Sequence, residues 1–227
     1  MKIYYPERII CLTEETTETL YLLGEQDRII GVSGFTVRPA IARKDKPKIS
    51  TFVDAKIDKI CDLKPDLVIG FSDIQGNIAK ELIEKGIPVW INNYRSVQGI
   101  KKMIFQLGIL VGRKQESLQL IQQINDQIDS IIKKVEKWEN QPKVYFEEWD
   151  DPMISGIKWV SEIIQIAGGI DIFPELQNES LAKNRIIHEP DLVVKRNPDI
   201  IIASWCGKKF KKDIMVERYG WEDIDAV

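Results

Sequence analysis

The stretch from residue 114 to residue 138 constrains the fold more than any other part of this sequence. Apolar residues recur there at spacings of three and four, namely Leu118, Ile121, Ile124, Ile128, Ile131, Val135 and Trp138. This spacing predicts one amphipathic helix of about six to seven turns. The stretch contains neither glycine nor proline, so we expect no hinge within it. Pro142 predicts that the helix has ended by that point.

Patterns of strands and helices lie on both sides of this helix. Before it, β-branched runs predict strands at 8–12, 28–34, 66–73 and 89–96, with helices at 55–63, 76–85 and 97–111. After it, the patterns predict strands at 143–146 and 199–204, with helices at 158–167 and 190–196. Strands that alternate with helices are typical of parallel sheets.

The predicted fold class is therefore α/β, with two Rossmann-like lobes that have parallel sheets and are joined by one long rigid helix. The boundaries follow from the patterns: an N-terminal lobe at 1–112, a linker helix at 113–140 and a C-terminal lobe at 141–227. A total of 227 residues suffices for two modest lobes. The second lobe looks truncated, because the chain stops before the pattern predicts a complete second sheet.

Charge and cysteine content exclude several classes of function. The 32 basic and 35 acidic residues are interspersed, and the absence of a basic stripe argues against nucleic acid as a partner. Cys11, Cys61 and Cys206 are odd in number and form no C-x-x-C motif, which argues against a zinc site and a disulfide framework. The glycine-rich phosphate-binding motifs are also missing. We therefore expect no metal and no resident cofactor.

The sequence offers no membrane-targeting signal. It has no apolar run approaching the ~20 residues of a transmembrane helix, and its first residues lack the apolar core of a signal peptide. As given, the chain is expected to be cytoplasmic. If a leader was removed, it would instead be periplasmic or surface-anchored.

Polar and aromatic residues follow the predicted strands, and ligands of open parallel sheets bind beyond the carboxyl ends of strands. The recurrence of such residues predicts a ligand site in a cleft between the lobes. The candidates are Phe35, Arg38, Phe71, Ser72 and Asp73 in the first lobe, and Glu147, Glu148, Trp149, Trp205 and Lys208 in the second. Trp149, Trp159 and Trp205 are expected to report binding through their fluorescence.

The run Glu147-Glu148-Trp149-Asp150 also allows a second interpretation. Two adjacent carboxylates suggest acid–base catalysis, although neighbouring side chains on an extended chain usually point apart. A cytoplasmic enzyme acting on a chelate ligand would draw on Glu147, Glu148, Lys208 and Cys206. The leading hypothesis is a binding protein with no catalytic residue.

Several segments resemble the class III substrate-binding proteins of ABC importers, which carry cobalamin, ferric siderophores or haem. The first lobe contributes "RIICLTEETTETLYLLGEQDRIIGVSGFT", "KPKIS" and "KIDKICDLKPDLVIG", and the second contributes "PMISGIKWVSEIIQIAGGIDIF" and "DLVVKRNPDIII". The patterns "FEEWD" and "SWCGKKF" resemble a subgroup of cobalamin-binding proteins that lack a signal peptide. The resemblance covers nearly the whole chain.

This resemblance implies a small-molecule ligand, cobalamin or a related corrinoid or ferric siderophore, held between two lobes. It places Phe35, Phe71 and the stretch from Met153 at lining positions. Arg38 and Arg185 stand where cobalamin-binding members have aromatic residues, which suits a ligand with acidic edges. The resemblance also implies an ABC permease as partner, with Asp191 as the docking residue in the second lobe and Glu81 as the nearest carboxylate in the first.

Overall fold

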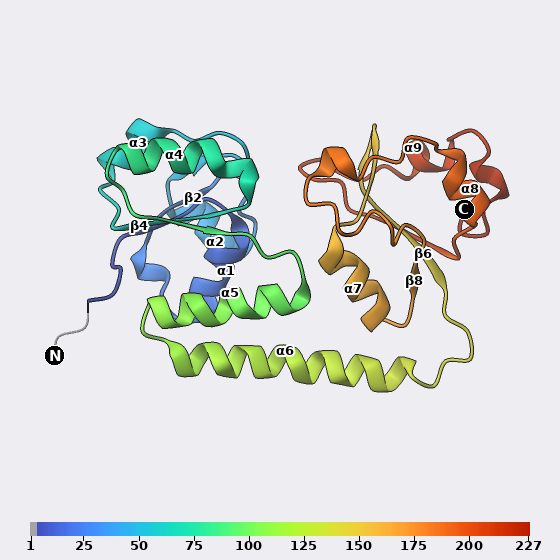
Figure 1. Ribbon diagram of the computed structural model, residues 1–227, viewed down its shortest axis with the longest axis horizontal. Helices are drawn as coiled ribbons and strands as arrows, with labels where there is room; N and C mark the ends of the chain where they lie inside the picture. The colour runs from blue at the N-terminus through green and yellow to red at the C-terminus, as the bar shows by residue number, and fades with distance from the viewer. Residues whose placement is uncertain (1–3) are drawn as a thin grey trace. The chain divides into compact units, whose positions relative to one another are not determined.

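The computed structural model describes residues 4–227, which form two compact units (Figure 1). One unit holds the described residues up to Tyr94 together with Gln98–Ile124. The other holds Arg95–Val97 and Asn125–Val227. The predicted fold class, two α/β units, is confirmed.

The N-terminal unit is built on one parallel sheet of five strands in the order β3-β2-β1-β4-β5. Its strands are β1 (Ile9–Cys11), β2 (Ile29–Ser33), β3 (Lys48–Ser50), β4 (Leu67–Phe71) and β5 (Val89–Asn92). Its helices are α1 (Glu14–Leu22), α2 (Ala40–Asp45), α3 (Ile57–Asp62), α4 (Gly76–Glu84) and α5 (Val97–Leu110), with 3₁₀ turns at Gln26–Arg28 and Asp73–Gln75. The strands are apolar runs because helices cover both faces of the sheet.

Two apolar clusters form the core of this unit, one on each face of the sheet. One joins α3 and α4 to Ile10 and Val68, through Ile60 and Leu82 among others. The other joins α1 and α5 to the opposite face and includes Leu20, Ile69 and Leu107. This two-sided burial fixes the register of the strands and therefore the positions of the loops at their carboxyl ends.

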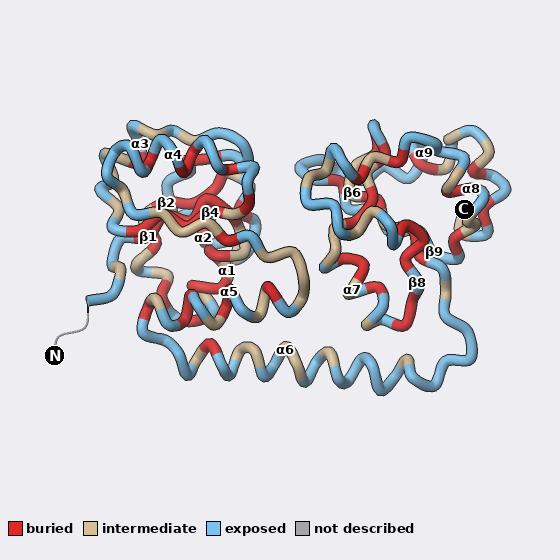
Figure 2. Tube along the Cα trace, in the orientation of Figure 1, coloured by how far each residue is buried: buried red, intermediate tan, exposed pale blue. Residues whose placement is uncertain are grey.

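The long helix α6 (Lys114–Val135) ends three residues before the predicted range does. Ile121 and Ile124 pack against the core of the N-terminal unit, whereas Ile131 is exposed. Ser117 is its single buried residue, and the rest of the helix is intermediate or exposed (Figure 2). The boundary between the two units falls within α6, and the predicted role of this segment as a separate linker stays a prediction.

The C-terminal unit has a mixed sheet of four strands rather than the purely parallel sheet that was predicted. Strand β6 pairs in parallel with β8 and β9 and antiparallel with β7. The strands are β6 (Lys143–Asp150), β7 (Met153–Ser155), β8 (Ile170–Asp171) and β9 (Ile200–Ala203). The helices are α7 (Lys158–Ile166), α8 (Asp191–Arg196) and α9 (Lys212–Val216), with 3₁₀ turns at Ala182–Asn184 and Trp221–Asp223.

Side chains of β6 alternate between two cores. Val144 and Phe146 pack on α7, while Tyr145 belongs to the larger cluster that includes Val193 of α8 and Trp221. Within the described part of the chain, none of the helices combines the length and the apolar character needed to cross a bilayer.

Candidate functional site

The acidic run of residues 147–150 lies within strand β6. The sequence predicted that the strand ends at residue 146, and this prediction is wrong. The strand continues to Asp150, pairing with β9 up to Glu147 and with β7 from Glu147 to Asp150. Carboxylates disfavour a half-buried strand unless cations compensate them. Glu147, Glu148 and Asp150 each have one cationic partner, described below.

Glu147 is fully buried and is the centre of a hydrogen-bonded cluster. Tyr145 Oη donates to its Oε2 at 2.8 Å, and Trp205 Nε1 donates to its Oε1 at 2.9 Å. The guanidinium of Arg218 donates to both carboxylate oxygens and to the carbonyl oxygen of Asp150. Glu147 and Trp205, both predicted to contact ligand, therefore lie beneath the surface, where they hold β6, β9 and the C-terminal segment together.

Glu148 has different partners from Glu147, as expected for adjacent residues of a strand. Its carboxylate binds the guanidinium of Arg185 through both terminal nitrogens, the shortest contact being 2.9 Å. Only 3% of the Arg185 side chain is exposed, against 23% for Glu148. Burial raises the pKa of Glu148, and Arg185 opposes that shift. Two residues that the sequence predicted to contact ligand, Glu148 and Arg185, therefore bind each other.

Lys208 is held against β6 by three groups. Its ammonium forms an ion pair with the buried carboxylate of Asp150 and lies 4.4 Å from the ring centre of Trp149 and 4.9 Å from that of Trp205. Burial alone would raise the pKa of Asp150, but the contact with Lys208 lowers it below its usual value. Cation–π contacts and the ion pair together tie the segment after β9 to the end of β6.

An exposed aromatic pair stands at the carboxyl ends of β2 and β3 in the N-terminal unit. The rings of Phe35 and Phe52 stack with their centres 5.0 Å apart, and both side chains are more than two-fifths exposed. Phe35 was predicted and Phe52 was missed. Arg38 lies nearby in sequence and is exposed, with its guanidinium paired to Glu14 at 3.3 Å.

Gln75 organises the same edge of the sheet from below. Its buried amide accepts a hydrogen bond from the N–H of Phe71 at 2.9 Å and donates to the carbonyl oxygens of Leu12 and Phe52. Three strand ends are thereby connected through one neutral side chain. Two further predicted residues, Ser72 and Asp73, adjoin it, with Ser72 Oγ donating to Asp73 at 2.6 Å.

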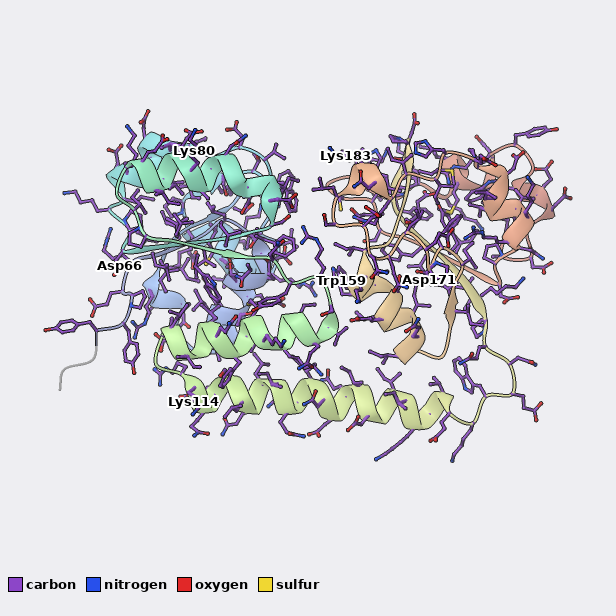
Figure 3. All side chains as sticks on the ribbon, viewed as in Figure 1. Asp66, Lys80, Lys114, Trp159, Asp171 and Lys183 are labelled. Carbon is purple, nitrogen blue, oxygen red and sulfur yellow. The ribbon has the colours of Figure 1, made fainter. Side chains whose placement is uncertain are left out.

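The remaining predicted residues lie on helices. Trp159 is exposed in the first turn of α7 (Figure 3). Asp191 opens α8, and Glu81 lies on α4; both are exposed. Asp191 also lines a hollow of about 640 Å³, together with Met153, Ile187, Ile214 and Tyr219. The docking assignments of Asp191 and Glu81 stay predictions.

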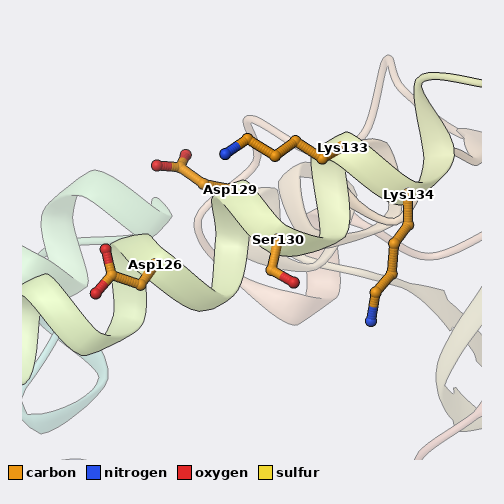
Figure 4. A pocket seen from close by; sticks show the side chains of 5 residues that line it. All are labelled: Asp126, Asp129, Ser130, Lys133 and Lys134. Atoms are coloured by element: carbon orange, nitrogen blue, oxygen red, sulfur yellow. The ribbon is translucent and has the colours of Figure 1, made fainter.

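A hollow of about 490 Å³ beside α6 offers no comparable chemistry. It is lined by Asp126, Asp129, Ser130, Lys133 and Lys134, all from successive turns of the same helix (Figure 4). Two aspartates are followed by two lysines along this solvated helix face, so the charges oppose one another as is usual for an exposed helix.

Three side chains considered for catalysis, those of Cys206, Glu147 and Lys208, lie in surroundings that disfavour a nucleophile or an acid–base role. Partial desolvation and the nearby carboxylate of Glu148 raise the pKa of the Cys206 thiol, so the nucleophilic thiolate is disfavoured. Glu147 is fully buried and hydrogen-bonded to three side chains, and Lys208 is engaged by Asp150. No cluster of three or more potential metal ligands occurs among residues 4–227.

The comparisons with known proteins agree with this architecture. Residues 9–227 match the family model described as periplasmic binding protein. The chain is 31% identical over 205 residues to the vitamin B12-binding protein of Vibrio campbellii, covering 87% of this chain and 70% of that protein. It is 27% identical to the ABC transporter substrate-binding lipoprotein YvrC of Bacillus subtilis, covering 98% of this chain and 70% of the lipoprotein.

Solved structures show the same fold at lower identity. The periplasmic vitamin B12 binding protein BtuF of Vibrio cholerae superposes with a TM-score of 0.78 at 19% identity, over 99% of this chain and 85% of that one. The periplasmic heme-binding protein RhuT of Roseiflexus sp. RS-1 gives 0.81 at 22% identity, over 96% and 85%. The resemblance found in the sequence is confirmed, and the chain belongs to the periplasmic binding protein family.

Proposed function

We propose that this protein is a non-catalytic substrate-binding protein that takes up cobalamin or a related corrinoid as part of an ABC import system. The names of its relatives supply the ligand class, since the relative from Vibrio campbellii binds vitamin B12. The observation that supports the proposal most directly is the exposed aromatic surface at the carboxyl ends of strands in the N-terminal unit. Phe35 and Phe52 offer a flat apolar surface of the kind that a planar chelate needs.

Trp149 supplies the corresponding surface in the C-terminal unit. Its indole Nε1 donates to the carbonyl oxygen of Asp151 at 2.8 Å, and the ammonium of Lys208 lies over its ring. The hydrogen bond holds the edge of the indole and the ammonium covers one of its faces, so the ring is held in place without ligand. Such preorganisation reduces the entropy that binding must remove. An ABC permease is the proposed partner, with Asp191 and Glu81 as proposed docking residues.

Calorimetric titration with cyanocobalamin tests the proposal. Trp149→Ala should weaken binding about ten- to a hundredfold, the loss expected for one large stacking contact of ~1–3 kcal/mol. Trp138→Ala removes another indole, one that is about half exposed near the end of α6, and should leave the dissociation constant unchanged. The melting temperature of each variant is measured on the same samples, since a packing role for Trp149 would lower that temperature and leave the affinity alone.

Two outcomes would count against the proposed function. Absence of heat for any corrinoid or ferric siderophore at ~100 μM, well above the dissociation constants typical of specific sites, would reject binding. A ligand whose mass changes after incubation with the protein would instead favour an enzyme acting on that ligand.

A further inference from the structure

Two cations beside strand β6, Arg185 and Lys208, are each paired with a carboxylate of that strand. Arg185 is paired with Glu148 at 2.9 Å, and Lys208 is paired with Asp150. The sequence associated Arg185 with a ligand that has acidic edges and placed Lys208 among the candidate ligand contacts. In the structure each of them already has a carboxylate partner.

Glu148 and Asp150 differ in how they shield their cations. Glu148 is the more exposed member of its pair, 23% against 3% for Arg185, so solvent reaches the carboxylate more than the guanidinium. Asp150 is the buried member of the other pair, 6% exposed against 37% for Lys208, and it fixes the ammonium over two indole rings. An approaching carboxylate would meet the partly exposed carboxylate of Glu148 and the ammonium of Lys208, which Asp150 already compensates.

An uncharged amide faces no such penalty. It can donate an N–H to Glu148 and offers a weakly basic oxygen to the cations, whereas a carboxylate would be repelled by Glu148. A planar chelate can carry either type of edge, because the amides of a corrin side chain can be replaced by carboxylates without altering the ring. The charge pattern therefore separates ligands by the chemistry of their edge.

We infer that Glu148 and Asp150 are specificity-determining residues, which adapt this face to a planar metal chelate with an uncharged amide edge and against one with a carboxylate edge. The inference rests on the proposed function, since it requires that a chelate binds at this face.

Two corrins with the same ring test this inference. Dicyanocobinamide presents amides, and dicyanocobyrinic acid presents carboxylates. Wild-type protein should bind the amide form at least about tenfold more tightly near neutral pH. Glu148→Gln and Asp150→Asn each leave one cation without its carboxylate. Each should improve binding of the acid form and so lower the ratio of the two dissociation constants, acid form over amide form, by about tenfold.

Asp151→Asn provides the matched control. It removes the same charge from the next position in the chain, where the side chain is exposed, and should leave the ratio unchanged. The double variant Asp150→Asn with Lys208→Met removes the whole ion pair and should restore the wild-type ratio. This restoration distinguishes a charge effect from a loss of packing.

The outcomes separate the inference from the proposed function. Equal affinity of the wild type for both corrins, or an equal effect of Asp151→Asn, overturns the inference while corrin binding stands. Binding of neither corrin rejects both. If Glu148→Gln fails to fold, the inference is still tested by the wild-type ratio and by comparing Asp150→Asn alone with Asp150→Asn combined with Lys208→Met.

Discussion

The two units hold the ends of their strands by different means. In the N-terminal unit one neutral amide, that of Gln75, joins three strand ends beneath an exposed aromatic pair. In the C-terminal unit three ion pairs act on a single strand, β6. Neutral hydrogen bonds respond little to pH and salt, whereas ion pairs respond to both. The comparison predicts that the two units fail under different conditions.

The largest effect is expected from Glu147→Gln. The change leaves the largely buried guanidinium of Arg218 without its carboxylate, and breaking a buried pair costs about 3–5 kcal/mol of the free energy of unfolding. Hydrogen exchange measured segment by segment should show the loss in β6, β9 and the C-terminal residues, with little change in β1–β5. Glu217→Gln, at an exposed position, is the control. A loss below ~1 kcal/mol, or one shared equally by β1–β5, would contradict the role of Glu147 in holding the C-terminal unit together.

A smaller effect is expected from Gln75→Ala in the N-terminal unit. The variant leaves the N–H of Phe71 and the carbonyl oxygens of Leu12 and Phe52 without their partner, at a cost of about 1–3 kcal/mol. Denaturant unfolding should give the same loss at pH 5 and pH 8, since no charge is removed. Gln98→Ala, at an exposed position, should change stability by less than about 0.5 kcal/mol. A strong pH dependence of the lost stability would contradict the view that neutral hydrogen bonds hold these strand ends.

The smallest effect concerns the pH dependence of Asp150. Its pKa is lowered in the folded protein, so its contribution to stability is complete above the unfolded value of about 3.9 and is lost as the pH falls through the folded value. The stability difference between wild type and Asp150→Asn should therefore be constant from about pH 6 to 8, at about 1 kcal/mol, and shrink below about pH 4. Unfolding curves recorded across this range measure it. A difference that grows on acidification would reverse the assigned sign.

Sequence patterns predicted the elements whose periodicity is long and unbroken. The stripe of α6 and the apolar runs of β1, β2, β4 and β5 all correspond to observed elements within a few residues. Short elements such as β3 and β7 were missed, since three residues carry too little periodicity to recognise.

The end of β6 could not be predicted because its stability comes from distant residues. Glu147 pairs with Arg218, which lies 71 positions along the chain, and Trp205 lies 58 positions away. Without those partners an acidic run has the character of a loop. Phe52 was missed for a related reason, because only the folded loop brings it against Phe35. The two glutamates, by contrast, were correctly expected to act separately.

The alternation along β6 has a consequence for how this chain can change. The side chains of Tyr145 and Glu147 lie on one face of the sheet, and that of Phe146 packs on the other. Substitutions alter these positions one at a time, but insertion or deletion of one residue within the strand would invert every later side chain at once. Such a shift would place Glu147 in the apolar layer against α7 and move an aromatic ring into the polar cluster. We therefore expect length variation among natural or engineered variants to be absent from β6 and to accumulate in the loops around it.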